Sequence, residues 1–285
     1  MEMEIANSFY QNGEFEKAIE HFNRIIEQNQ NNSEAFEGRG LCHYSILQIE
    51  KAISDLDKAV EIDSDNHGAY YNRGLIRLER KEFHKAKKDL EKAIEIYGDS
   101  TEYISNCAYV NLLLKNYEEV IFYAKQLLEF NTDDRYGLEY LADVFLDTGR
   151  YREAILYYKK ILRLEPQNGY IFNNIGFALS RMEEYQKAIP YFNAAIKLLP
   201  NFAYSYDNRG YCIFKLGDAE NGMKDIMKAL EIDPSNSYAY KYKGIIHESI
   251  GENEMAMESF LKAEELGYSE KHDSEVKELI EKNKN

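Results

Sequence analysis

The residue types that most often carry out chemistry in proteins are spread along this chain without forming a catalytic group. The six histidines form neither an HExxH motif nor another pair with metal-ligand spacing. They are His21, His43, His67, His84, His247 and His272. The Asn-Arg-Gly stretches at 72–74 and 208–210 lie inside predicted helices, whereas a phosphate-binding loop stands between a strand and a helix. No nucleophile is accompanied by a base, so we expect a protein that is not an enzyme and that uses no metal or cofactor.

The three cysteines also point away from site chemistry. Cys42, Cys107 and Cys212 are too widely spaced for a metal site or a disulfide framework, and each falls within a predicted helix. We interpret them as buried free thiols in a reducing compartment. The first residues are acidic, without the basic start and apolar run of a signal peptide or a membrane span, so we expect a cytoplasmic protein.

The elements that would position any site follow a period of 34 residues. Within 169–202, Ile175 and Leu179 share one face of a helical pattern, and Ala188 and Phe192 share one face of a second pattern that Pro200 ends. A unit of this size cannot bury enough apolar surface to fold alone, so it must be repeated. The period predicts eight such units along residues 1–268. They begin near residues 1, 33, 67, 101, 135, 169, 203 and 237.

Small residues recur at two positions of every unit. Because two helices can cross closely only where neither has a bulky side chain, these positions predict the contact within each helix pair. The eighth position holds Ala6, Gly40, Gly74, Ala108, Ala142, Gly176, Gly210 and Gly244. The twentieth holds Ala18, Ala52, Ala86, Val120, Ala154, Ala188, Gly222 and Ala256.

This pattern resembles the tetratricopeptide repeat family, whose 34-residue helix–turn–helix unit has small residues at these positions and a proline near its end, here Pro166, Pro200 and Pro234. The resemblance implies an all-α fold, a right-handed α-solenoid or superhelix. Residues 269–285 break the repeat, and Val276, Leu279 and Ile280 form one apolar stripe there. We interpret 269–285 as a C-terminal capping helix that covers the last repeat.

Two positions of the repeat vary together. Where the seventh residue is Arg, the residue sixteen further along is Asp; where the seventh is apolar or Cys, that later residue is aromatic. Three units hold Arg39 with Asp55, Arg73 with Asp89, and Arg209 with Asp225; three others hold Cys107 with Tyr123, Leu141 with Tyr157, and Ile175 with Tyr191. The last unit, with Lys243 and Ser259, fits neither pattern. A partly buried guanidinium needs a carboxylate, so we predict three structural ion pairs. The alternative is a set of independent surface charges.

In this family the first helix of each unit lines the concave surface, so the resemblance places a ligand at the outward positions of those helices. Asn is a poor residue for a helix interior, yet it recurs at the sixth position. The candidate peptide-binding residues are Asn72, Asn106, Asn174, Asn208, Tyr109, Phe177, Tyr211, Tyr136, Tyr170, Tyr204 and Tyr238. Asn amides can donate to and accept from a peptide backbone, and Tyr adds flat contact area. Alternatively, the tyrosines pack one first helix against the next.

The charge of the chain limits its partners. A net charge of −15 argues against a nucleic acid or an anionic membrane as the main partner. The clamp with which the family holds the C-terminal carboxylate of chaperones needs Lys or Arg beside Asn on successive first helices, and this chain lacks it. Glu37 and Glu139 add negative charge to those helices, which only Lys241, Arg181 and Lys215 counter toward the C-terminal half. We therefore expect a non-enzymatic scaffold that binds an extended peptide or protein segment. The alternatives are a structural subunit that assembles through its ends or convex face, including self-association, and a module that binds a small molecule or regulates an enzyme.

Overall fold

The computed structural model describes residues 2–272 and 274–283, and all regular secondary structure among them is α-helical. The helices of the first half are α1 (Glu2–Gln11), α2 (Phe15–Gln28), α3 (Ser33–Ser45), α4 (Ile49–Ile62), α5 (His67–Glu79), α6 (Phe83–Ile96), α7 (Thr101–Leu113), α8 (Tyr117–Phe130) and α9 (Arg135–Asp147). Those of the second half are α10 (Tyr151–Leu164), α11 (Gly169–Arg181), α12 (Tyr185–Leu198), α13 (Ala203–Lys215), α14 (Ala219–Ile232), α15 (Ser237–Ser249), α16 (Asn253–Glu265), α17 (Tyr268–Lys271) and α18 (Glu275–Asn283). The predicted all-α fold is confirmed.

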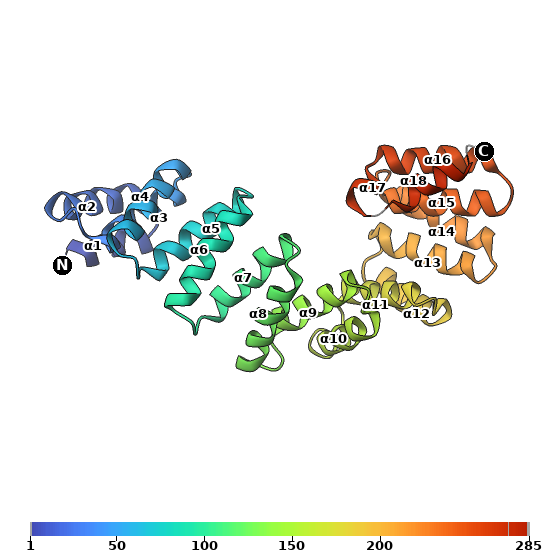
Figure 1. Cartoon of the computed structure of the whole chain (residues 1–285), viewed down its shortest axis with the longest axis horizontal. Helices are drawn as coiled ribbons and strands as arrows, with labels where there is room; N and C mark the ends of the chain where they lie inside the picture. The colour runs from blue at the N-terminus through green and yellow to red at the C-terminus, as the bar shows by residue number, and fades with distance from the viewer. Residues whose placement is uncertain (1, 273, 284–285) are drawn as a thin grey trace. The chain divides into compact units, whose positions relative to one another are not determined.

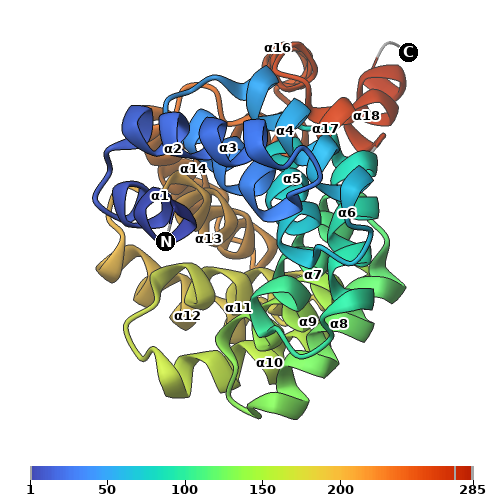
Figure 2. The same ribbon diagram turned by 90° about the vertical axis from the view of Figure 1, so that its left-hand side faces the viewer.

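The helices fall into two compact units, residues 1–144 and 145–285, and the division lies within α9. From here on, we call each of these two halves a unit and each 34-residue helix pair a repeat. In the first unit α1 packs on α2, α3 on α4, α5 on α6, and α7 on α8, as Figures 1 and 2 show from two directions. In the second unit the same pairing joins α11 to α12, α13 to α14, and α15 to α16. Each unit is thus a stack of helix pairs, the arrangement of an α-solenoid.

The close approach within a pair depends on the small residues. A Cβ atom on Gly210 would lie 2.7 Å from the carbonyl oxygen of Gly222, and one on Gly222 would lie 2.8 Å from that of Gly210. Larger residues would therefore separate α13 from α14. A large side chain stands one helical turn after the small residue of the second helix. Phe192 follows Ala188 in this way and Phe260 follows Ala256, and both rings are fully buried.

Side chains fix where the first helix of a pair begins. Asn32, Asn66, Asn168 and Asn236 each precede a helix and accept a hydrogen bond from a backbone N–H in its first turn. In the first unit, the Nδ2 group of Asn66 donates to the hydroxyl of Ser33, and that hydroxyl donates to the carbonyl of Ala59. The cap of one repeat is therefore also bonded to the repeat before it.

The first helices of adjacent pairs contact one another more closely than the second helices do. Such contacts join α1 to α3 and α3 to α5 in the first unit, and α11 to α13 and α13 to α15 in the second. Each unit therefore has an inner row of first helices. We call the surface of this row the first-helix face.

The end of the chain differs from the single predicted capping helix. The structure has a short helix, α17, followed by α18, and residues 273 and 284–285 of the predicted segment lie outside the described residues. Val276 and Ile280 of α18 are buried against Phe260 and Ala263 of α16. The apolar stripe thus covers the last repeat.

Candidate functional site

Arginine and aspartate from the two helices of one pair are in direct contact at all three places where they co-vary. Each pair has two hydrogen bonds, one from Nε and one from Nη2 of the arginine. The distances are 2.8 and 2.6 Å for Arg39 and Asp55, 2.9 and 2.6 Å for Arg73 and Asp89, and 2.7 and 2.8 Å for Arg209 and Asp225. All six side chains are mostly buried, so these groups hold the pair together.

Each of these arginines also reaches back to the preceding repeat, which sequence reasoning missed. In each case the arginine Nη1 donates a hydrogen bond of 2.7 Å. Arg39 donates to Asn23, Arg73 to Asp57, and Arg209 to Asn193. A signal was present, because an Asn or Asp stands sixteen residues before each of these arginines. Where the seventh residue is not Arg, that place holds Glu91, Lys125 or Lys159 in the middle repeats.

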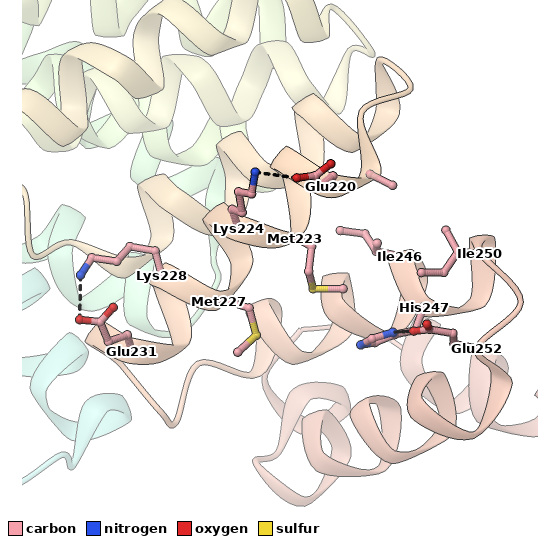
Figure 3. A pocket seen from close by; sticks show the side chains of 11 residues that line it. Glu220, Met223, Lys224, Met227, Lys228, Glu231, Ile246, His247, Ile250 and Glu252 are labelled. Atoms are coloured by element: carbon pink, nitrogen blue, oxygen red, sulfur yellow. Dashed lines mark hydrogen bonds and ion pairs between the residues drawn. The ribbon is translucent and has the colours of Figure 1, made fainter.

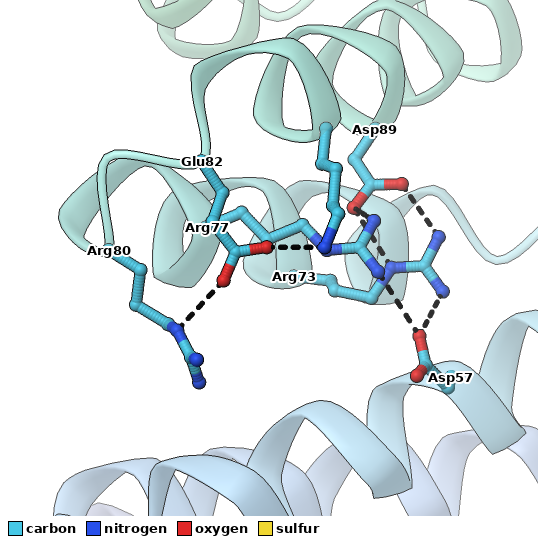
Figure 4. A network of polar contacts seen from close by, with 7 residues as sticks. Asp57, Arg73, Arg77, Arg80, Glu82 and Asp89 are labelled. Carbon is cyan, nitrogen blue, oxygen red and sulfur yellow. Dashed lines mark hydrogen bonds and ion pairs between the residues drawn. The ribbon is translucent and has the colours of Figure 1, made fainter.

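The network around Arg73 is the most extensive of the three (Figure 4). Arg77 donates to Asp89 at 2.6 Å and lies 3.5 Å from Asp57, so two arginines of α5 share two carboxylates of α4 and α6. Burial lowers the pKa of Arg73, but hydrogen bonds and charge from Asp89 and Asp57 outweigh it and raise that pKa. These cations are neutralised within the chain.

Polar contacts join the first helices of the first unit into one continuous row. Asn72 of α5 donates to Glu37 of α3 at 3.2 Å. Tyr71 of α5 donates to Glu102 of α7 at 2.7 Å. Asn106 of α7 donates in turn to the Tyr71 hydroxyl at 2.9 Å. The amide donors of Asn72 and Asn106 are therefore already bonded within the chain.

A cavity of about 540 Å³ opens at the next step of this row. Three candidate residues from the sequence line it: Asn106 and Tyr109 of α7 and Tyr136 of α9. Tyr109 and Tyr136 are 42% and 58% exposed, so their rings are available for contact. Tyr140 closes one wall, and its hydroxyl donates to the carbonyl of Ser105 at 3.1 Å. We call this the α7–α9 cavity.

The α7–α9 cavity is acidic as well as aromatic. Its lining includes the carboxylates of Glu102 and Asp134 and, among the described residues, no Lys or Arg. Asp134 also caps α9, because its Oδ1 accepts a hydrogen bond from the backbone N–H of Gly137 at 2.7 Å. Arg135 nearby is paired with Glu139 on its own helix.

The candidate tyrosines of the second unit contact one another along the repeats. Tyr204 meets Tyr238 edge-on with ring centroids 6.4 Å apart, and Phe202 lies between Tyr170 and Tyr204. Tyr211 stacks on Tyr242 at 4.4 Å. These rings therefore pack repeat against repeat, as the alternative in the sequence analysis held, while Tyr170 and Tyr204 remain partly exposed.

The other candidates in the second unit are less accessible. Asn174 donates to the hydroxyl of Tyr158 at 3.3 Å, and Phe177 is half-buried. Asn208 is only 7% exposed, which leaves it little surface for a ligand. The structure thus gathers Asn106, Tyr109 and Tyr136 into one cavity, whereas the candidates of the second unit are dispersed or packed.

Lys241 does not contribute positive charge to the first-helix face, contrary to the sequence-based expectation. It is 3% exposed, and its Nζ donates to the Tyr268 hydroxyl at 2.8 Å and to Glu275 of α18. The segment after the repeats covers it, and the repeat pattern alone contains no signal of that contact.

A second hollow, of about 1010 Å³, lies on α14 and the end of α15 (Figure 3). Met223, Met227, Ile246 and Ile250 give it an apolar lining, and Met227 and Ile250 are about half exposed. The lysines at its rim are paired on their own helix, Lys224 with Glu220 and Lys228 with Glu231. We call this the α14–α15 groove.

The described residues provide neither a metal site nor a membrane-spanning helix. Within the described residues, no group of three or more His, Cys, Asp or Glu side chains is arranged to hold a metal ion. No helix in the same part of the chain combines the length and apolar character that crossing a bilayer requires.

Comparison with known proteins agrees with the geometry. Sequence models of the tetratricopeptide repeat match residues 3–67, 67–100, 136–168, 169–202 and 203–236. The chain therefore belongs to the tetratricopeptide repeat family, whose members generally serve as scaffolds for protein interaction. A comparison with curated proteins found no match.

Solved structures with the same fold have low sequence identity. A tetratricopeptide repeat protein from Parabacteroides merdae ATCC 43184 is 20% identical with a TM-score of 0.73, and the match covers 90% of this chain and all of that one. Residues 41 to the end of MamA from Desulfovibrio magneticus RS-1 are 23% identical with a TM-score of 0.52, over 60% and 97% of the two chains. Yeast Tom70 is 16% identical with a TM-score of 0.55, over 95% of this chain and 58% of that one. At these identities the likeness shows the fold alone.

Proposed function

We propose that this protein is a non-enzymatic scaffold that binds an extended segment of a partner protein on its first-helix face. The observation that carries the proposal is the α7–α9 cavity, where Asn106, Tyr109 and Tyr136 meet at an exposed hollow. A cavity of this size accepts one or two side chains, and the flat tyrosine rings provide contact area with little loss of conformational entropy. The three buried free thiols support a reducing compartment, for which we propose the cytoplasm.

The proposal is tested by affinity capture of partner proteins with the full chain and with two single variants. Tyr136→Ala removes an exposed ring from the α7–α9 cavity, and Phe122→Ala removes an equally exposed ring, 57%, from the second helix α8. A protein bound through the first-helix face is lost from Tyr136→Ala and retained by Phe122→Ala. If all bound proteins are retained by both variants at equal helicity, the first-helix face is not the binding surface.

The α14–α15 groove favours a second candidate function, assembly with another copy of the chain. Met223, Met227, Ile246 and Ile250 give it an apolar lining (Figure 3), and the exposed side chains of Met227 and Ile250 provide apolar surface of the kind found at protein interfaces. Light scattering across a range of concentrations tests this. A dimer that Met227→Glu converts to a monomer supports assembly through the groove, and a monomer at all concentrations rules it out.

A further inference from the structure

The first-helix face of the first unit carries carboxylates that are not paired with Lys or Arg. Glu34 and Glu37 lie on α3, and Glu102 lies on α7. No ion pair to any of these three is found among the described residues. On α3, α5 and α7 the only Lys or Arg side chains are Arg39, Arg73 and Arg77. All three form ion pairs or hydrogen bonds with carboxylates or amides of the second helices. Arg135 of α9 is paired with Glu139, so Lys and Arg of these helices leave Glu34, Glu37 and Glu102 uncompensated.

The carboxylate of Glu37 is bonded by neutral amides and not by a Lys or Arg. It is half-buried and accepts a hydrogen bond from the neutral amide of Asn72. Burial raises its pKa, and the hydrogen bonds from Asn66 and Asn72 offset that only in part. A cation placed beside Glu37 would favour its charged form.

The α7–α9 cavity adds a feature that a simple acidic surface lacks. Its two carboxylates, Glu102 and Asp134, stand among the rings of Tyr109, Tyr136 and Tyr140. Lys and Arg side chains bind favourably over aromatic faces, and their long apolar stems pack against rings while the charged end reaches a carboxylate. Neither a carboxylate nor a purely apolar side chain would satisfy this combination.

We propose that the segment bound on the first-helix face is basic, and that one of its Lys or Arg side chains enters the α7–α9 cavity between Tyr109, Tyr136 and the carboxylates of Glu102 and Asp134. This inference rests on the proposed function and names the chemical class of the partner. The row of contacts from Glu37 through Asn72, Tyr71 and Asn106 leads to the cavity from the preceding repeats, so further basic residues of the segment meet Glu37 and Glu34.

The experiment uses random linear dodecapeptides displayed on phage and selected on the full chain. Selected peptides are synthesised, and their affinities are measured for wild type, Tyr109→Ala and Phe122→Ala. Peptides weakened on Tyr109→Ala alone form the cavity-dependent set. Each of these is also made with its Lys and Arg residues replaced by Gln.

The carboxylates are tested by a matched pair of double variants. Glu102→Gln/Asp134→Asn removes two charges from the cavity while Asn retains the cap of α9. Glu118→Gln/Glu129→Gln removes two charges from exposed positions on α8. Both change the net charge equally, so a difference between them is local and not a general effect of charge.

The expected result is a cavity-dependent set enriched in Lys and Arg. Replacement of these residues by Gln weakens binding about tenfold, and the cavity double variant weakens the parent peptides about fivefold, whereas the α8 double variant leaves them unchanged. A cavity-dependent set that is neutral or acidic overturns the basic segment and leaves the proposed function standing. If no selected peptide depends on Tyr109, both the inference and the proposed function are overturned.

Discussion

Arg209 and Asp225 face each other across one helix pair, with Nε 2.7 Å from Oδ2 and Nη2 2.8 Å from Oδ1. The corresponding positions in the preceding pair hold Ile175 and Tyr191, of which Ile175 is fully buried. The same place in the repeat thus takes either a bidentate ion pair or an apolar residue together with Tyr. Both solutions avoid leaving a mostly buried charge without a partner.

The first prediction is that one solution can replace the other. Asp225→Ala leaves the guanidinium of Arg209 without its carboxylate and lowers the free energy of unfolding by about 2 kcal/mol. Arg209→Ile/Asp225→Tyr copies the preceding repeat and recovers at least half of that loss. Urea unfolding followed by circular dichroism measures both variants. A double variant no more stable than Asp225→Ala would show that the two positions do not act as a pair.

The second prediction concerns Asp207, which is fully buried in α13. Its Oδ2 accepts from Asn236 at 2.6 Å, and its Oδ1 has no hydrogen-bond partner among the described residues. Burial raises its pKa well above the usual range. Because the folded-state pKa lies above the unfolded one, ionising Asp207 destabilises the fold, and this penalty grows as pH rises from about 4.

Asp207→Asn removes the charge at nearly constant shape and raises the melting temperature at pH 7. The gain shrinks at pH 4.5, where the native aspartate keeps its proton. Thermal melts of wild type, Asp207→Asn and the exposed control Glu254→Gln at both pH values measure this. Equal gains at the two pH values, or destabilisation at pH 7, would contradict a buried acid.

The third prediction uses the turn between the helices of each pair. The same position has a positive φ in all eight turns: Gly13, Leu47, Lys81, Lys115, Gly149, Glu183, Gly217 and Gly251. Leu47 is 83% exposed with φ at 61°, so its side chain brings strain without burial. Leu47→Gly therefore stabilises the protein by about 0.5 kcal/mol, the balance between relieved strain and the greater chain entropy of Gly.

Leu156→Gly is the control for the turn, because Leu156 is exposed within α10 and lies in ordinary helical backbone. There the change destabilises by about 1 kcal/mol. Chemical denaturation of both variants distinguishes the two effects by their sign. Loss of stability in both would mean that the positive φ of Leu47 carries no strain.

The fourth prediction concerns the segment after the repeats. Val276 is fully buried against α16, so Val276→Asp places an unpaired carboxylate in that contact and detaches α18. Hydrogen exchange then increases in α16 and at Lys241, which loses its contact with Glu275. Glu278→Gln, at an exposed position on the same helix, leaves exchange unchanged. Unchanged exchange in Val276→Asp would mean that α18 does not protect the last repeat.

Much of this fold could be predicted because each repeat contacts chiefly its neighbours. A fixed period therefore predicts the helix boundaries, and the covariation of Arg39 with Asp55 predicts their contact within a pair. The bonds from Arg39 to Asn23 and from Arg73 to Asp57 had the same kind of signal at the opposite offset.

The site was harder to predict because it depends on features that break the period. Lys241 is buried only because Tyr268 and Glu275 follow the last repeat. Asn106, Tyr109 and Tyr136 meet at a cavity, whereas Asn208, at the same repeat position as Asn106, is buried. Position in a repeat fixes which face a side chain occupies, but its neighbours decide whether it is exposed.

The most direct measurement of the central claim, that a partner binds on the first-helix face, is site-specific photo-crosslinking. The full chain is made with p-benzoylphenylalanine in place of Tyr109 on α7 or, as control, in place of Phe122 on α8, both of them exposed in the native chain. Each is irradiated with the proteins of the source cell. The account predicts a crosslinked partner at position 109 and none of the same mass at position 122. The same partner crosslinked at position 122 alone would contradict it.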